Sequence, residues 1–279
     1  MIYQILLLNL PNSVFSLENL ATSRLRRCEN LKQVPSLAKL TTSRKLDLGE
    51  TGITKVPDGL EMLVNLEFLN LNAYELKVMP LGILPKLSHL QYLTVYWHLK
   101  SAEVNEEEIA SLKELETFAG YFDDMDKFST YIRSLENRRL SCYQIQVGMW
   151  GDGYKAVSSF FIGKEVRLEG ECNLRRGDES LVLPKDLQFL QISRCHDLRS
   201  LCDISSLKHT SELKHITLIE CKGIEHVLSF SSSCTLPLLQ TLEKLMLVYL
   251  NNLQVLFRKE RVASAWVPSD TFSRLKIFI

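Results

Sequence analysis

The chain has 279 residues, of which 46% are hydrophobic and 24% are charged, and its formal net charge is zero. This length exceeds what one compact core usually holds, so it favours two domains or an elongated array. The balanced charge gives no reason to expect a nucleic acid or an anionic membrane as partner. No run of 18 apolar residues occurs, so no membrane span is expected. Leucine fills 50 positions and glycine only 12, which directs attention to a repeated packing unit.

One pattern recurs along the chain. Leucines three positions apart lead into a short segment with apolar residues two apart, and a cysteine, asparagine or threonine often follows three positions later. Side chains two apart point to one face of a strand, and stacked coils can share a core that one coil cannot form. The spacing is about 25 residues, within the range of about 20–29 for leucine-rich repeats. The ten copies place their first inward position at residues 23, 46, 69, 93, 118, about 143, 166, 190, 216 and 245.

We therefore predict an α/β fold, a leucine-rich repeat solenoid or horseshoe. It would have a concave parallel β-sheet of about ten short strands and a mostly irregular convex side with short helices. Residues 1–279 would form a single domain, with 1–16 as a partial leading repeat, 100–186 as irregular repeats with a helical insertion, and a truncated C-terminal repeat. The residues expected in the core include Leu69, Leu71, Leu190, Ile192, Leu245 and Leu247.

The first two coils depart from the pattern, because Ser23 and Ser43 stand where leucine is expected. A missing core leucine costs on the order of 2–5 kcal/mol if the site cannot collapse. We expect these coils to be looser than the middle ones or their strands to shift in register.

The middle of the chain contains an acidic stretch at residues 103–108 and then YFDDMDKFSTYIRSLENRR. Phe128, Tyr131, Ile132 and Leu135 have the spacing of one helix face, and three aspartates precede them. This predicts an amphipathic helix on the convex side. The following CYQIQVG alternates as a strand does.

The seven cysteines are widely spaced and include no C-x-x-C pair, which favours reduced thiols and a cytoplasmic protein. The absence of any Asn-x-Ser/Thr site agrees with that location. Cys28, Cys195 and Cys221 follow strands directly, where a small buried side chain is expected.

No motif for chemistry is found. Residues 148–155, GMWGDGYK, lack the Lys-Ser/Thr of a phosphate loop and are interpreted as a turn. The histidines and cysteines have no repeated ligand spacing for zinc. We expect no enzyme activity, no catalytic residue, no cofactor and no metal.

The concave face is the expected protein-binding surface, formed by the residues that alternate with the leucines. Its first repeat is basic and repeats three to five are aromatic. A covering insertion after residue 100, or a register slip of one residue, would hide these aromatic side chains. The predicted binding residues are Arg24, Arg26, Arg27, Phe68, Tyr92, Tyr96, Trp97, Tyr121 and Phe122.

Four segments carry a resemblance to a known family: residues 16–40, 46–71, 128–135 and 187–201. With the phrase T-x-I-x-x-V-P from Thr51 to Pro57, they resemble the repeat domain of plant coiled-coil nucleotide-binding leucine-rich repeat disease-resistance proteins. The resemblance extends from about Leu10 to the end, but the phosphate loop and the coiled coil of that family are missing, so the chain looks like a fragment.

The resemblance implies that the domain recognises a pathogen effector or a guarded host protein. It also implies autoinhibition of a nucleotide-binding domain in the full-length receptor. The alternative is a substrate-recruiting repeat adaptor of a ubiquitin ligase, for which no F-box-like segment is visible. A non-functional gene fragment is a third interpretation, compatible with the flawed first coils.

Overall fold

The structure is a computed structural model that describes residues 10–11, 13, 17–95, 104–135, 138, 140–148, 163–170, 181–230, 240–259 and 275–279. The chain divides into two compact units. Unit 1 holds the described residues up to Phe122 together with Ser134–Tyr143, and unit 2 holds Asp123–Arg133 and the described residues from Gln144 onward. The single-domain organisation of residues 1–279 stays a prediction.

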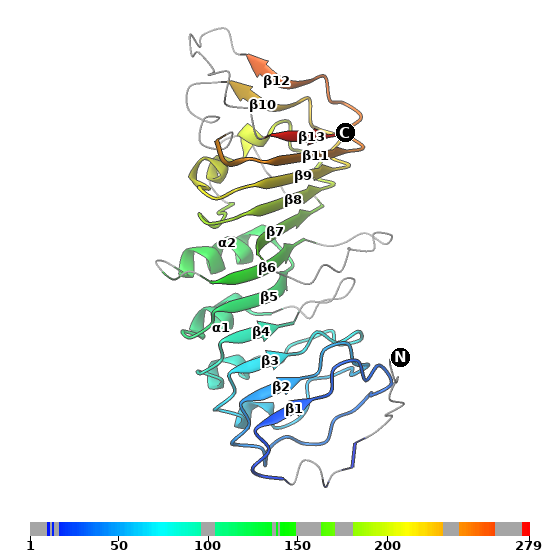
Figure 1. Cartoon of the computed structure of the whole chain (residues 1–279), viewed down its shortest axis with the longest axis vertical. Coiled ribbons are helices and arrows are strands. Elements are labelled where there is room, and N and C mark those ends of the chain that lie inside the picture. Colours follow the sequence, from blue (N-terminus) through cyan, green and yellow to red (C-terminus); the bar gives the residue numbers. More distant parts are fainter. Residues whose placement is uncertain are drawn as a thin grey trace. The chain divides into compact units, whose positions relative to one another are not determined.

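Unit 1 contains a parallel sheet whose strands follow the chain order (Figure 1). The inward positions 46, 69, 93 and 118 stand side by side on neighbouring strands, which is the alignment that the repeat spacing predicts. The strands are β1 (Thr22–Arg24), β2 (Lys45–Asp47), β3 (Phe68–Asn70), β4 (Tyr92–Thr94) and β5 (Thr117–Phe122).

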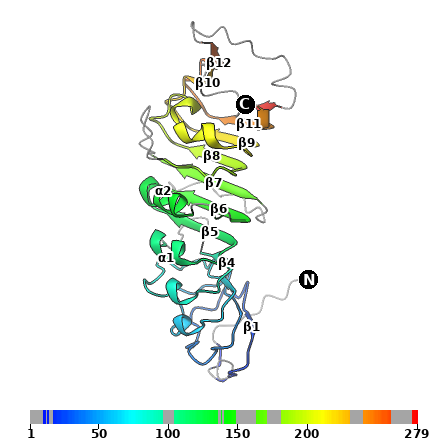
Figure 2. The same cartoon turned by 90° about the vertical axis from the view of Figure 1, so that its left-hand side faces the viewer.

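Short helices connect these strands. They are η2 (Leu60–Met62), η3 (Leu84–Lys86) and α1 (Glu106–Ser111), and α1 lies to one side of β4 (Figure 2). Glu106, Glu107 and Glu108 of the acidic stretch form the first turn of α1, where negative charge favours a helix N-terminus. Asn105 caps α1, since its side-chain oxygen accepts a hydrogen bond from the Glu108 amide at 3.0 Å.

Unit 2 repeats the same arrangement with longer strands. Its main sheet contains β7 (Lys164–Glu169), β8 (Phe189–Ser193), β9 (His215–Ile219), β11 (Lys244–Val248) and β13 (Lys276–Phe278), all parallel. The strands β10 (His226–Phe230) and β12 (Val255–Lys259) form a separate two-stranded parallel sheet. The 3₁₀ helices η4 (Leu201–Asp203) and η5 (Ser205–His209) follow β8.

Two elements lie at the division between the units. The helix α2 (Met125–Ser134) falls where the sequence predicted an amphipathic helix, and Phe128 and Tyr131 are fully buried on its inner side. The strand β6 (Cys142–Val147) matches the predicted strand.

The core confirms the repeat pattern. Leu69, Leu71, Leu190, Ile192, Leu245 and Leu247 are all at most 2% exposed. All ten predicted inward positions lie within strands, and both sheets of the repeat are parallel. The chain is therefore a leucine-rich repeat solenoid, with its leucines shared between successive coils.

The turn cysteines are buried as expected at positions 28, 195 and 221. Cys28 and Cys221 are free thiols, as are Cys142 and Cys202. Cys195 is disulfide-bonded, so the expectation of a reduced thiol at this position is wrong. Spacing along the chain does not identify disulfide pairs, because a disulfide requires two cysteines with Cα atoms within about 7 Å in space.

The two serines at leucine positions do not shift the register. Ser23 pairs with Leu46, as the repeat requires. Ser23 is 7% and Ser43 only 1% exposed, and neither hydroxyl has a hydrogen-bond partner. A buried hydroxyl without a partner keeps its desolvation cost, so these sites weaken the first coils by leaving a polar atom unsatisfied.

We expect Ser43→Ala to raise the free energy of unfolding by about 1 kcal/mol, because it removes the unsatisfied hydroxyl from the core. Chemical denaturation of the two purified proteins measures the difference. Ser88→Ala, at an exposed position of the same unit, is the matched control and should change stability by less than about 0.5 kcal/mol. A destabilised Ser43→Ala protein would contradict this account of the first coils.

Candidate protein-binding face

The outer face of unit 1 is the side of its sheet opposite the leucines. Strand alternation places two columns of side chains there. The first column holds Thr22, Lys45, Phe68, Tyr92 and Thr117, and the second holds Arg24, Asp47, Asn70, Thr94 and Ala119.

Three neighbours in the first column form what we term the Lys45–Phe68–Tyr92 stack. The rings of Phe68 and Tyr92 are parallel within 10°, and their centroids are 4.2 Å apart. The Lys45 ammonium lies 3.9 Å from the centroid of the Phe68 ring. Both contacts are favourable, since a cation is attracted to an aromatic face and stacked rings bury apolar area. The stack is half-buried and holds the aromatic side chains in a fixed position on the face.

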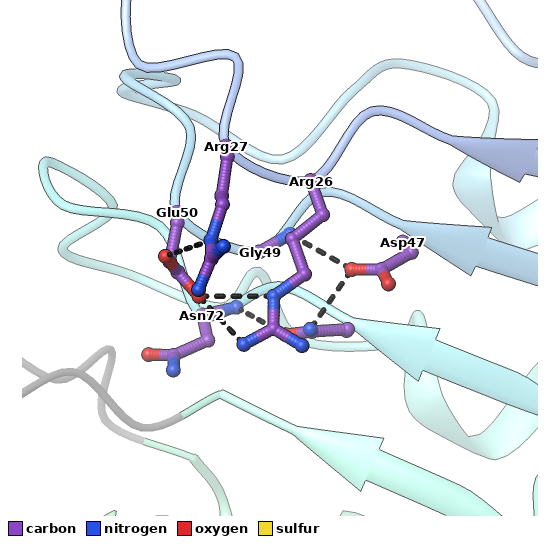
Figure 3. Close-up of polar contacts among 7 residues, drawn as sticks. Arg26, Arg27, Asp47, Gly49, Glu50 and Asn72 are labelled. Carbon is purple, nitrogen blue, oxygen red and sulfur yellow. Dashed lines mark hydrogen bonds and ion pairs between the residues drawn. The ribbon is translucent and has the colours of Figure 1, made fainter. Parts of the chain in front are cut away.

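The second column contains a polar ladder. Asn70 donates from Nδ2 to Asp47 Oδ1 at 2.9 Å, and the same oxygen accepts the Gly49 amide at 3.2 Å (Figure 3). Asn70 Oδ1 in turn accepts the Asn72 amide at 3.0 Å. One oxygen of the buried Asp47 carboxylate thus accepts from the backbone of its own coil and from Asn70 of the next coil, and this holds the two side chains in place on the face.

A cluster of charges follows the strands β1 and β2 (Figure 3). Arg26 donates to Glu50 Oε1 at 2.9 Å from Nε and at 2.6 Å from Nη2. Arg27 donates from Nε to Glu50 Oε2 at 3.1 Å. Arg27 and Glu50 occupy equivalent positions of successive coils. The backbone of both residues is in the left-handed region, with φ of 67° and 57°. The two arginines share one carboxylate, so the cluster carries a net positive charge.

The Glu50 carboxylate feels opposing effects. Partial burial raises its pKa, but the hydrogen bonds and charges of Arg26 and Arg27 outweigh burial and hold the pKa below its usual range. The hydrogen bond to Glu50 raises the pKa of Arg26. Glu50 therefore stays ionised at neutral pH and keeps both arginines in place.

The predicted binding residues divide into several groups. Arg24 is exposed, Arg26 and Arg27 are held by Glu50, and Phe68 and Tyr92 stack together. Tyr121 is half-buried. Tyr96 and Trp97 lie outside the described residues.

The outward orientation predicted for Phe122 is wrong. Phe122 is 0% exposed and meets Phe118 edge-on, with centroids 6.3 Å apart. β5 has six residues, whereas β1 to β4 have three, so strict alternation continues and turns residues 118, 120 and 122 inward. Gly120 has no side chain because a Cβ there would lie 2.3 Å from Cζ of Phe118.

The sheet of unit 2 presents its own outer face. The Phe189 and His215 rings meet edge-to-face at 4.7 Å, and Arg167 pairs with Glu165 at 2.6 Å. Sequence analysis overlooked Phe189 as a surface residue, although its place directly before Leu190 is the signal that could have revealed it.

A buried carboxylate lies at the end of β7. Glu169 is only 5% exposed, and burial raises its pKa to about 7. The Arg194 charge 3.5 Å away and a hydrogen bond from Ser193 act in the opposite direction. The Glu220 carboxylate, which accepts a bond from Arg194 at 3.1 Å, adds to the rise in pKa.

Among the described residues, no group of three or more His, Cys, Asp or Glu side chains is placed to hold a metal ion. No helix in the described part of the chain is long and apolar enough to cross a membrane.

No protein-family model and no curated protein matches this sequence. Solved structures of leucine-rich repeat proteins do match. One is a protein of Leptospira interrogans, with 16% identity over 98% of this chain and 75% of that one, at a TM-score of 0.48. Another is the ectodomain of the receptor kinase GASSHO1/SCHENGEN3 of Arabidopsis thaliana, with 20% identity over 90% of this chain and 29% of that one, at 0.43. An internalin of Listeria monocytogenes has 15% identity over 94% of this chain and 87% of its own chain, at a TM-score of 0.38. Identities of this size concern the repeat fold alone.

The Glu169 pKa predicts how stability depends on pH. In the unfolded chain this carboxyl titrates near 4.5 and in the folded protein near 7, so the folded state binds the extra proton between these values. Stability should therefore fall as pH rises from about 5 to 8, by up to about 3 kcal/mol. Denaturation curves at several pH values measure the slope.

Glu169→Gln should flatten that slope and be the more stable protein at pH 8. Glu243→Gln, an exposed glutamate of the same unit, serves as the control and should retain the wild-type slope. If the slope survives in Glu169→Gln, another group is responsible.

Proposed function

We propose that this chain recognises other proteins through the outer face of unit 1, as the repeat domain of a plant innate immune receptor. The observation that carries the proposal is the Lys45–Phe68–Tyr92 stack beside the net positive Arg26–Glu50–Arg27 cluster. Preformed aromatic side chains and arginines are enriched among the residues that dominate protein interfaces. The repeat fold supports a binding role, since solenoids offer extended surfaces to partners.

The sequence resemblance supplies the finer part of the proposal. It supports recognition of a pathogen effector or of a guarded host protein in the defence response. It also supports a second contact, with the nucleotide-binding domain of the full-length receptor, that keeps the receptor inactive. A basic first repeat suits an acidic surface on that domain.

We expect Phe68→Ala and Tyr92→Ala each to reduce the binding free energy for the protein partner by about 1–2 kcal/mol, because each substitution removes an aromatic side chain from the face. The wild-type domain and both variants are used to capture proteins from infected plant tissue. A protein that only the wild-type domain captures is the candidate partner. The affinity for the purified partner is then measured for all variants.

Tyr249→Ala is the matched control, because Tyr249 is an exposed tyrosine of unit 2 with 68% of its surface accessible. It should bind as the wild type does. Equal binding by all four proteins would refute a role for the outer face of unit 1. Capture of a ubiquitin-ligase component with a degradation substrate would instead support the adaptor alternative.

Arg24 tests the autoinhibitory contact. Its side chain is exposed, whereas Arg26 and Arg27 also stabilise the fold through Glu50. In the full-length receptor, Arg24→Glu should weaken the contact with the nucleotide-binding domain most strongly at low salt and cause activity without a ligand. Cell-death assays and pull-downs at two salt concentrations measure both effects.

Lys39→Glu makes the same change of charge at an exposed position outside the sheet. This control variant should leave the receptor inactive in the absence of ligand. Unchanged resting behaviour of the Arg24→Glu receptor would contradict an electrostatic contact at this place.

A further inference from the structure

A polar pocket crosses three coils of unit 2, on the segments that follow β8, β9 and β11. We term it the Glu225 pocket. Its volume is about 700 Å³, within the range of roughly 300–1,000 Å³ that ligand sites usually have. Along the pocket, Arg199, Glu225 and Gln254 occupy equivalent positions of successive coils. The Glu225 amide donates to the Arg199 carbonyl at 3.1 Å, and the Gln254 amide donates to the Glu225 carbonyl at 2.9 Å.

The charged side chains of the Glu225 pocket are unpaired. Asp197 and Arg199 are exposed and Glu225 is half-buried, and none of the three forms an ion pair or a side-chain hydrogen bond with another described residue. On the same two coils, Arg194 and Glu220 do pair, at 3.1 Å. The coil spacing therefore allows an ion pair that Arg199 and Glu225 do not form. A guanidinium and two carboxylates thus keep their hydrogen-bonding groups for a ligand.

The middle coil has no side chain in one row of the pocket. Gly223 stands between Asp197 and Asn252, and a Cβ there would lie 2.2 Å from the carbonyl oxygen of His196. The glycine is needed for the close approach of the two coils, and its lack of a side chain leaves space in the row. Asn252 is fixed in place, because its Nδ2 donates to the Lys222 carbonyl at 2.6 Å.

The third coil adds neutral amides. The side chains of Asn251 and Gln254 are exposed and have no hydrogen-bond partner among the described residues. Each amide offers both donors and an acceptor. Leu253 is the one apolar side chain that the structure describes in the lining. Most ligand sites of this size are lined mainly by apolar side chains, so the Glu225 pocket suits a ligand that is itself polar.

The unpaired charges narrow the class of ligand. An anion would meet the carboxylates of Asp197 and Glu225, and a cation would meet the guanidinium of Arg199. Within the described part of the chain, no three metal-ligating side chains are assembled, in this pocket or elsewhere. A protein segment would have to place a cation and an anion of its own against these groups. A neutral hydroxyl, in contrast, donates to a carboxylate and accepts from a guanidinium.

We propose that the Glu225 pocket binds a neutral carbohydrate. Adjacent hydroxyls of a sugar take the place of the water that hydrates the exposed charges, and they reproduce its hydrogen bonds. Hydrogen bonds from hydroxyls to Glu225 and Asp197, and from Arg199 to a hydroxyl, are charge-assisted and therefore stronger than neutral ones. This site is separate from the outer face of unit 1 and does not depend on the proposed function.

The test titrates neutral trisaccharides of glucose, N-acetylglucosamine, galactose, mannose and xylose into the full chain, with calorimetry as the readout. At least one should bind at millimolar concentration or below. The corresponding amino-sugar and uronic-acid trisaccharides should bind at least roughly fivefold more weakly, because each brings a charge against a like charge of the pocket. Absence of binding by all five neutral compounds would overturn the proposal, as would equal or tighter binding by a charged one.

Two variants locate the site. Glu225→Gln keeps the shape of the side chain and removes its charge, and Arg199→Met removes the guanidinium donors. Each should weaken sugar binding at least roughly fivefold without lowering the melting temperature, because neither side chain has a partner among the described residues. Glu243→Gln makes the first change at an exposed position of unit 2 outside the pocket and should bind like the wild type. Undiminished binding by both pocket variants would contradict the proposal.

The outcome is separable from that of the proposed function. Phe68→Ala and Tyr92→Ala should leave sugar binding unchanged, because both side chains belong to unit 1. If a captured protein partner depends on Glu225 and Arg199 while no sugar binds, the pocket is a protein site and the carbohydrate proposal is wrong.

Discussion

The structure depends on one constraint: a single coil of this chain cannot bury its own leucines. Leu46, Leu69 and Leu93 are fully buried only because they lie side by side on neighbouring strands. Burial of such a side chain contributes about 1.5–3 kcal/mol, so every coil gains stability from the next one. The same alignment also lines up the residues that face outward, and the Lys45–Phe68–Tyr92 stack is a direct consequence.

The backbone turn after each strand has a second effect. Arg27, Glu50, Arg194, Glu220 and Tyr249 occupy equivalent positions after β1, β2, β8, β9 and β11, and all have positive φ. A left-handed conformation costs roughly 1–2 kcal/mol for a residue with a Cβ. In each unit, an arginine at this position pairs with a glutamate of the following coil. These ion pairs offset part of that cost, and they place charge along one edge of the sheet.

Several buried polar atoms mark the positions where the leucine repeat is incomplete. The hydroxyls of Ser23 and Ser43 are buried in leucine positions, and the Glu169 carboxyl is buried at the end of β7. The unsatisfied hydroxyl of Thr94 differs from the serines because Thr94 belongs to the outer face of unit 1. All three hydroxyls keep a desolvation cost that no hydrogen bond within the described residues offsets.

Much of the fold follows from the sequence alone, because leucine spacing sets the period and the alternation of strands sets which side chains are inward. All ten inward positions and the helix around Phe128 were predictable in this way. The tertiary structure decided what alternation cannot show. The extra length of β5 places Phe122 in the core, and the stacking of coils brings Arg26 and Arg27 into contact with Glu50. Each of these depends on contacts between residues distant in the chain, whose distance is set only when neighbouring coils have packed.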